Sequence, residues 1–399
     1  MFSRSNPLLG PVGTSRAPLA DAVATDRLTE LDALRGIASL IVLLHHAAQV
    51  TPWARWWGEA PGLGSVVEAV MDHSPFQVLR EGRQAVLFFF VLSGYVVVLG
   101  LRRSGSPGLA AFAAARTVRL LLPVAASVLL SLVLHALVFD AEVLARLRPH
   151  SLYTWWNPVT TRSVLMHLVL AGSDPDLRLN VVLWSLVHEW RTSVLLPLLL
   201  PFRSWPVVPV AFALALHAMT VFLGTPEDEV MLGWSVLRSF VATVYFALPV
   251  ALGGALALAA PLSWPCRPAD RWAVALSALA LFSLGSDLAC FIGSMLVIAL
   301  ASQPGRFVSF LRHPFLAWLG RVSFSLYLVH TLVLVGALHA LHDLLPLGAI
   351  ALAGALASLP VAAAFHALVE QPSQSLARRV ARRLRAPPGT SQYLTPTRP

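Results

Sequence analysis

The chain contains about ten stretches of predominantly apolar residues, most of them long enough to cross a bilayer as an α-helix, for which roughly 20 residues are needed. Composition agrees, because 57% of the residues are hydrophobic and only 12% are charged. No repeated alternation of apolar and polar residues indicates strands. The sequence therefore predicts an all-α integral membrane protein, a polytopic bundle of about ten transmembrane helices. The predicted helices cover residues 31–50, 85–101, 118–139, 181–200, 207–223, 236–258, 272–284, 288–301, 315–338 and 347–369.

Three regions are expected along the chain. Residues 1–30 form a polar leader without a signal-peptide cleavage pattern, and residues 31–371 form the transmembrane domain. Residues 372–399 form a basic tail rich in arginine, proline and serine, which we expect to be disordered. Long connections at residues 51–84 and 140–180 are expected to cover a site at one end of the bundle.

Arginine sets the expected orientation. The chain has no lysine and a formal net charge of +9, and its arginines fall on alternate connections. By the positive-inside rule, these connections and both termini lie in the cytoplasm of a multi-pass plasma (inner) membrane protein, whereas the acidic turns at 227–229, Asp287 and Asp343 lie outside. The positive charge favours contact with anionic lipid over nucleic acid. The two cysteines, Cys266 and Cys290, suggest no disulfide framework, and we expect no metal site.

The first apolar stretch carries Arg35 and His46 in a segment otherwise suited to lipid. Their separation of eleven residues returns to within about 20° of the same helix face, with a rise of roughly 16 Å. Ionisable side chains inside a membrane usually face a protein interior or a cavity, so both are candidate site residues. The alternative for Arg35 is that it reaches towards lipid headgroups. His45 is expected to be structural, and so are four other histidines: His135, His167, His217 and His366.

Two further apolar stretches contain polar side chains at helical spacing. Ser185 and Glu189 share a face at i and i+4, and Ser323, Tyr327 and His330 form one stripe at i, i+4 and i+7. Counting residues from the helix ends places Glu189 at a depth similar to that of His46 and His330. Near the start of the second stretch, Ser93-Gly94 reads as a site of close helix packing.

These segments resemble the membrane acyltransferase 3 family over nearly the whole chain. The matching motifs are Leu31-Asp-x-Leu-Arg-Gly-x-Ala with His46, Phe88-Phe-Phe-x-Leu-Ser-Gly94, Arg116-x-x-Arg119, Trp184-Ser-Leu-x-x-Glu189, Ser323-x-Ser-Leu-Tyr-Leu-x-His330 and Val369-Glu-x-Pro372. The resemblance implies a ten-helix enzyme that moves an acyl group, usually acetyl from acetyl-CoA, to hydroxyls of cell-surface glycans and, in some members, to lipids or antibiotics. The residues after Glu189 differ from those of many members.

The resemblance also implies roles for individual residues. Acyl transfer needs a base for the hydroxyl, and His46 is the candidate, with Glu189 or His330 orienting it or the acceptor. Ser185 and Tyr327 complete the candidate catalytic set. Arg35, Arg116 and Arg119 are expected to bind the phosphates of an acyl-CoA donor, although Arg116 and Arg119 also read as ordinary cytoplasmic charges. No tightly bound cofactor is expected, and the partners are acyl-CoA, a glycan or glycolipid acceptor and the bilayer.

Three other functions remain open at this stage. A secondary transporter also places His, Glu and Arg inside the membrane, but we find no repeats or paired broken helices. An acyltransferase acting on a lipid or a small secondary metabolite is a second alternative. A structural subunit for envelope polysaccharide is the third.

Overall fold

All regular elements of the described chain are helices, which confirms the all-α class. The computed structural model describes residues 18–50, 81–104, 108–143, 154–155, 158–171, 173, 177–224, 231–260 and 267–384. Within these ranges, six helices are long and apolar enough to cross a membrane, and α9 and α12 are shorter apolar helices. Each of the ten predicted stretches coincides with helix.

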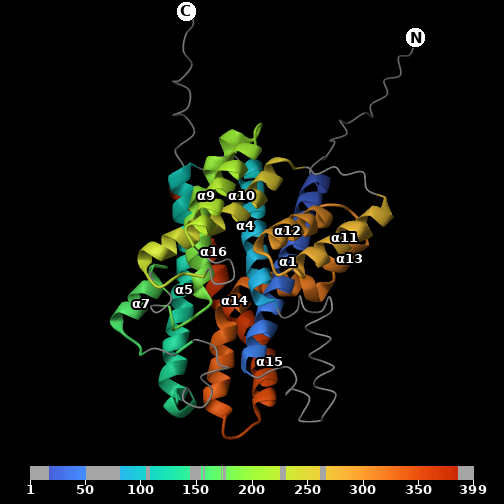
Figure 1. Ribbon diagram of the computed structural model, residues 1–399. Coiled ribbons are helices and arrows are strands. Elements are labelled where there is room, and N and C mark those ends of the chain that lie inside the picture. The colour runs from blue at the N-terminus through green and yellow to red at the C-terminus, as the bar shows by residue number, and fades with distance from the viewer. Residues whose placement is uncertain are drawn as a thin grey trace, which may run out of the picture.

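The helices follow one another as an extended series (Figure 1). In the first half they are α1 (Pro18–Val50), α4 (Gly82–Ser104), α5 (Leu109–Val138), α7 (Thr161–Leu168), α8 (Leu183–Leu195), the 3-10 helix η2 (Leu196–Phe202) and α9 (Val207–Phe222). In the second half they are α10 (Val236–Leu258), α11 (Pro268–Phe282), α12 (Asp287–Ala301), α13 (Arg306–Leu311), α14 (Pro314–Leu341), α15 (Leu347–Phe365), the π-helical turn η3 (His366–Glu370) and α16 (Gln371–Leu384).

Two predicted stretches contain breaks with clear local causes. The stretch at 181–200 changes from α-helix to 3-10 helix at Leu196, because Pro197 and Pro201 lack the backbone N–H that the α-helical pattern needs. The short stretches at 272–284 and 288–301 are two separate helices. Gly285 adopts a φ of 69° between them, a conformation that favours glycine.

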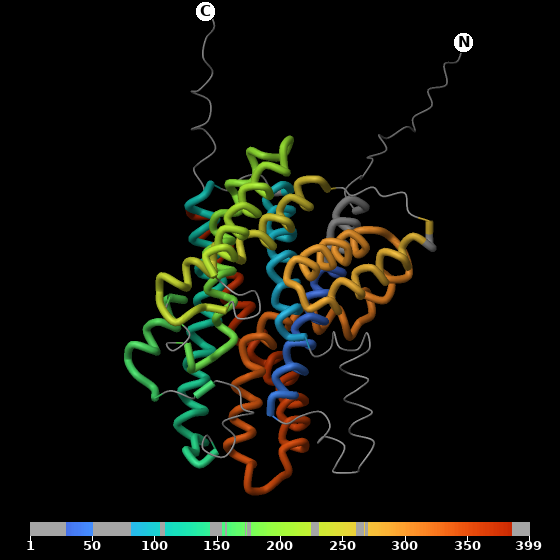
Figure 2. Tube along the Cα trace, viewed as in Figure 1, coloured from blue at the N-terminus to red at the C-terminus, as the bar shows by residue number. Residues whose placement is uncertain are grey.

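The contact between α1 and α14 organises the centre of the bundle (Figure 2). The two helices run in parallel with a constant register of 284 residues, seen in the Ser39 Oγ to Ser323 O hydrogen bond. Gly36 and Gly320 lie at the crossing, where a Cβ on Gly36 would lie 2.6 Å from the Gly320 nitrogen. Because both residues lack a side chain, the backbones touch. The same register, ten residues further on, places His46 against His330.

The remaining long helices surround this pair. α4 packs between α1 and α10, and α5 packs against α14 and α16. Glycines allow close approach of α4 and α10 as well, since a Cβ on Gly94 would overlap the carbonyl of Val250. The interpretation of Gly94 as a packing residue is therefore correct. In Figure 1, α11, α12 and α13 lie to one side of α1, whereas α5, α14 and α15 extend furthest towards the lower end.

The C-terminal tail differs from the expectation of disorder. Residues 371–384 form α16, which continues α15 through the π-helical turn as one helical segment, Leu347–Leu384. Its alternation of small and basic residues gives an amphipathic helix, which buries Ser373 and Ala377. Several other expectations fall outside the described residues: those on residues 51–80, the acidic turn at 227–229, Cys266 and residues 385–399.

Candidate active site

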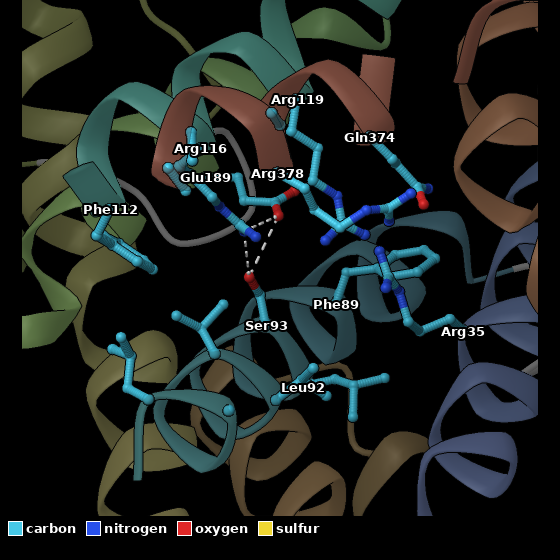
Figure 3. Close-up of a pocket in the computed structure, with 17 residues that line it drawn as sticks. Arg35, Phe89, Leu92, Ser93, Phe112, Arg116, Arg119, Glu189, Gln374 and Arg378 are labelled. Atoms are coloured by element: carbon cyan, nitrogen blue, oxygen red, sulfur yellow. Dashed lines mark hydrogen bonds and ion pairs between the residues drawn. The ribbon is translucent and has the colours of Figure 1, made fainter. Parts of the chain in front are cut away.

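A cavity of about 480 Å³ lies between α1, α4, α5, α8 and α16, and we call it the arginine cavity. Figure 3 shows arginine side chains from three different helices directed into it. Its polar and charged lining consists of Arg35, Ser93, Arg116, Arg119, Glu189, Gln374 and Arg378. Apolar residues from α4 and α5, among them Phe89 and Phe112, form most of the remaining wall.

Arg116 and Glu189 form an ion pair at the wall of this cavity. Arg116 Nη2 lies 2.8 Å from Glu189 Oε1, and the Ser93 hydroxyl donates to the same carboxylate oxygen at 3.2 Å. Arg116 Nε also donates to Ser193 Oγ at 3.1 Å. Both charged side chains are partly buried, at 12% and 21% exposure, and a carboxylate in that setting is stabilised by a cationic partner. Arg116 is therefore fixed in place and is not an ordinary surface charge.

Arg35 and Arg119 differ from Arg116 in having no such partner. Within the described ranges, neither makes a hydrogen bond or an ion pair, although both line the arginine cavity. Asp32 and Glu370 interact with them electrostatically but do not line the cavity. Two unpaired guanidinium groups facing one cavity inside a helical bundle form a site suited to an anion with several charges.

A second, small cavity of about 30 Å³ continues from the arginine cavity, and Arg35, Phe89 and Glu189 line both. Ser185 and Tyr327 close its far side, with their hydroxyl oxygens 2.6 Å apart. The Tyr327 hydroxyl donates to the carbonyl of Val182 at 3.0 Å. The predicted sharing of a helix face by Ser185 and Glu189 is correct, because both line the small cavity.

His46 and His330 form a hydrogen-bonded pair beyond the small cavity, one turn past Tyr327. His330 Nδ1 lies 2.9 Å from the carbonyl oxygen of Leu326. A carbonyl can only accept, so in the neutral ring Nδ1 carries the proton and Nε2 is an acceptor. His46 Nδ1, 2.9 Å from His330 Nε2, must then donate. This leaves the Nε2 atom of His46 with a free lone pair, the form in which an imidazole acts as a base.

The structure thus separates the candidate residues into two layers. Arg35, Arg116 and Arg119 line the arginine cavity with Glu189, whereas His46 and His330 lie further along α1 and α14 and line none of the described cavities. The expectation that Glu189 lies at the depth of the histidines and orients His46 is wrong. α8 carries Glu189 towards Arg116, and the ion pair holds it there.

Other polar residues of the apolar stretches have structural partners. Arg83 binds Asp287 through two contacts, of 3.1 and 2.6 Å, and Tyr245 donates to the same carboxylate. Asp287, expected in an exposed turn, is only 3% exposed because Arg83 neutralises it. His167 and His217 lie within hydrogen-bond distance of backbone carbonyls, as expected of structural histidines.

Three lining residues were not among the predicted site residues: Ser93, Gln374 and Arg378. Ser93 belongs to a motif that was interpreted as packing, although its hydroxyl bonds to Glu189. Gln374 and Arg378 lie in the segment that was expected to be disordered. The spacing of 374, 377, 378 and 381 on one helical face was the available signal.

The comparison with known proteins agrees with this arrangement. The model of the acyltransferase domain of the acyltransferase 3 family matches residues 28–367, which include α1, both layers of candidate residues and η3 up to Ala367. Searches of curated proteins and of solved structures give no significant match. Since the match covers far more than half of the chain, the protein belongs to the acyltransferase 3 family and is a multi-pass membrane acyltransferase.

Proposed function

We propose that this acyltransferase moves an acetyl group from cytoplasmic acetyl-CoA to a hydroxyl of an envelope or exported glycan. The observation that carries the proposal is the arginine cavity, with its unpaired Arg35 and Arg119. CoA bears a diphosphate and a 3′-phosphate, and guanidinium groups bind phosphate oxygens in pairs. The arginine-rich connections at this end of the bundle support a cytoplasmic entry for the donor.

The size of the small cavity supports a short acyl group. Its volume of about 30 Å³ holds a group of roughly one or two water molecules in size. Phe89 and Tyr327 form its aromatic walls and leave no room for a long chain. Donor phosphates in the arginine cavity would direct the thioester past Arg35 into this space, towards the histidines.

In the proposed reaction His46 Nε2 takes the proton of the acceptor hydroxyl. The resulting oxygen nucleophile attacks the thioester carbonyl, and the C–O bond forms as the tetrahedral intermediate develops. Collapse of the intermediate breaks the C–S bond. The CoA thiolate then takes the proton from His46, so the products are the acetyl ester and free CoA. His330 keeps its hydrogen bond to His46 Nδ1 and stabilises the transient imidazolium.

Ser185 and Tyr327 act as positioning residues in this scheme. The Tyr327 hydroxyl spends its proton on Val182, and Ser185 is within 2.6 Å of it, so the pair joins α8 to α14 beside the small cavity. Glu189 lies one turn after Ser185 and holds Arg116 at the donor side. These contacts set the spacing between the phosphate-binding arginines and the base.

The proposal is tested by reconstituting the purified protein in liposomes with acetyl-CoA labelled in the acetyl group. Release of the free CoA thiol and transfer of label to added glycan, lipid or small alcohols are measured separately. We expect thiol release that depends on a glycan acceptor and is absent in His46→Ala. Label recovered in lipid would assign the enzyme to lipid acceptors, and label recovered in small alcohols would assign it to small metabolites. Glycan-independent thiol release at the wild-type rate in His46→Ala would contradict the mechanism.

A further inference from the structure

The C-terminal helix α16 contributes one face to the arginine cavity. Gln374, Ala377, Arg378 and Ala381 line it, at a spacing that places them on one side of the helix. Arg379, the next residue in the chain, is exposed and does not line the cavity. The helix therefore presents one selected arginine to the site and directs its neighbour elsewhere.

A buried carboxylate fixes the position of α16. Glu370, only 4% exposed, ends the π-helical turn before α16. Its carboxylate accepts hydrogen bonds from the Ser325 hydroxyl at 2.6 Å and from Gln374 Nε2 at 2.9 Å, and lies 2.8 Å from His366 Nδ1. π-Helical turns of this kind occur frequently at functional sites. Because Ser325 belongs to α14, these bonds hold α16, and with it Arg378, against the central pair of helices.

The charge around Arg378 is uncompensated. Its hydrogen bond is to Ser375 Oγ at 3.0 Å, and no carboxylate in the described part of the chain forms an ion pair with it. Among the described residues that line the cavity, Glu189 is the sole carboxylate, and Arg116 already occupies it. Figure 3 shows Arg378 close to Arg119, in the part of the cavity between α5 and α16. The cavity thus offers more positive charge than a diphosphate alone needs.

The order of groups along CoA assigns a ligand to Arg378. If the thioester points past Arg35 towards the small cavity, the diphosphate follows it and the 3′-phosphate lies furthest out. Arg378 is exposed and neighbours Ala381 and Leu101 at the arginine-rich end of the cavity, whereas Arg116 is held deeper by Glu189. Resting on the proposed function, we infer that α16 is part of the donor site and that Arg378 recognises the 3′-phosphate of acyl-CoA.

The test is calorimetric titration of the detergent-solubilised full chain with CoA and with dephospho-CoA, which lacks only the 3′-phosphate. Wild-type protein should bind CoA more tightly than dephospho-CoA. Arg378→Gln should bind CoA roughly tenfold more weakly, the effect of one lost charge-assisted contact, with unchanged affinity for dephospho-CoA. Arg379→Gln, the matched control on the same helix, should retain both affinities. Thermal unfolding of each variant verifies that the fold is kept.

The outcomes separate this inference from the proposed function. Equal losses for CoA and dephospho-CoA in Arg378→Gln, or no loss for either, would overturn the 3′-phosphate assignment alone, provided that Arg119→Gln still weakens both ligands. If wild-type protein bound neither ligand, or if Arg119→Gln changed neither affinity, the donor site itself would be wrong and the inference would be overturned with it.

Discussion

At the scale of single residues, His46 is distinguished from its neighbour His45 by its partner. His46 bonds to His330, whereas His45 Nε2 lies 3.0 Å from Gln49 on its own helix. We predict that His46→Ala lowers kcat by roughly 100- to 10,000-fold, the usual contribution of a general base, with CoA affinity unchanged. His45→Ala serves as the control and should retain most activity. Equal losses in the two variants would indicate a structural role for both.

The arginines of the cavity should contribute unequally to donor binding. Arg35→Gln and Arg119→Gln each remove an unpaired guanidinium and should weaken CoA binding by about 1–3 kcal/mol. Arg116→Gln should in addition lower thermal stability, because it leaves Glu189 partly buried without its cation. Arg119→Lys should recover only part of the affinity, since lysine cannot make a two-point contact. Calorimetry and thermal melting measure the two effects, and equal melting temperatures would contradict the ion-pair argument.

At the scale of elements, the Gly36–Gly320 crossing determines the register of the site. A Cβ at Gly36 would meet the backbone of α14, so Gly36→Ala must separate the helices and with them His46 and His330. We expect a loss of about 1–3 kcal/mol in stability and a lower kcat. Gly336→Ala is a suitable control on α14, since the nearest atom to its Cβ is a Leu134 methyl at 3.8 Å. Similar melting temperatures for the two variants would contradict the packing argument.

At the scale of the whole molecule, the distribution of arginine predicts sidedness. Leu344 lies in the exposed turn between α14 and α15, and Ser391 lies in the C-terminal tail. In a protein without Cys266 and Cys290, Leu344→Cys should react with an impermeant maleimide in intact cells, whereas Ser391→Cys should react only after permeabilisation. The opposite pattern would invert the topology and place the arginine cavity on the external side.

The sequence determined the helical class and most residues of the site, because these depend on local patterns. Apolar stretches of bilayer length and the helical spacing of Arg35, His46, Ser185 and Tyr327 can be read without knowledge of the neighbouring helices. The same patterns could not reveal the 3-10 geometry at η2 as a break between two helical segments until the prolines were placed in it. Local periodicity thus gave the faces of the helices but not their partners.

Only the tertiary structure decided which faces meet. Counting residues from helix ends assumes that every helix starts at the same depth, and that assumption misplaced Glu189, which the ion pair with Arg116 holds in the donor layer. The contacts of Glu370 with Ser325 join segments 45 residues apart and bring Arg378 to the cavity. The parallel contact of α1 and α14 joins segments 284 residues apart and pairs the histidines. Such contacts depend on helix packing across the chain, which no local pattern in one sequence encodes.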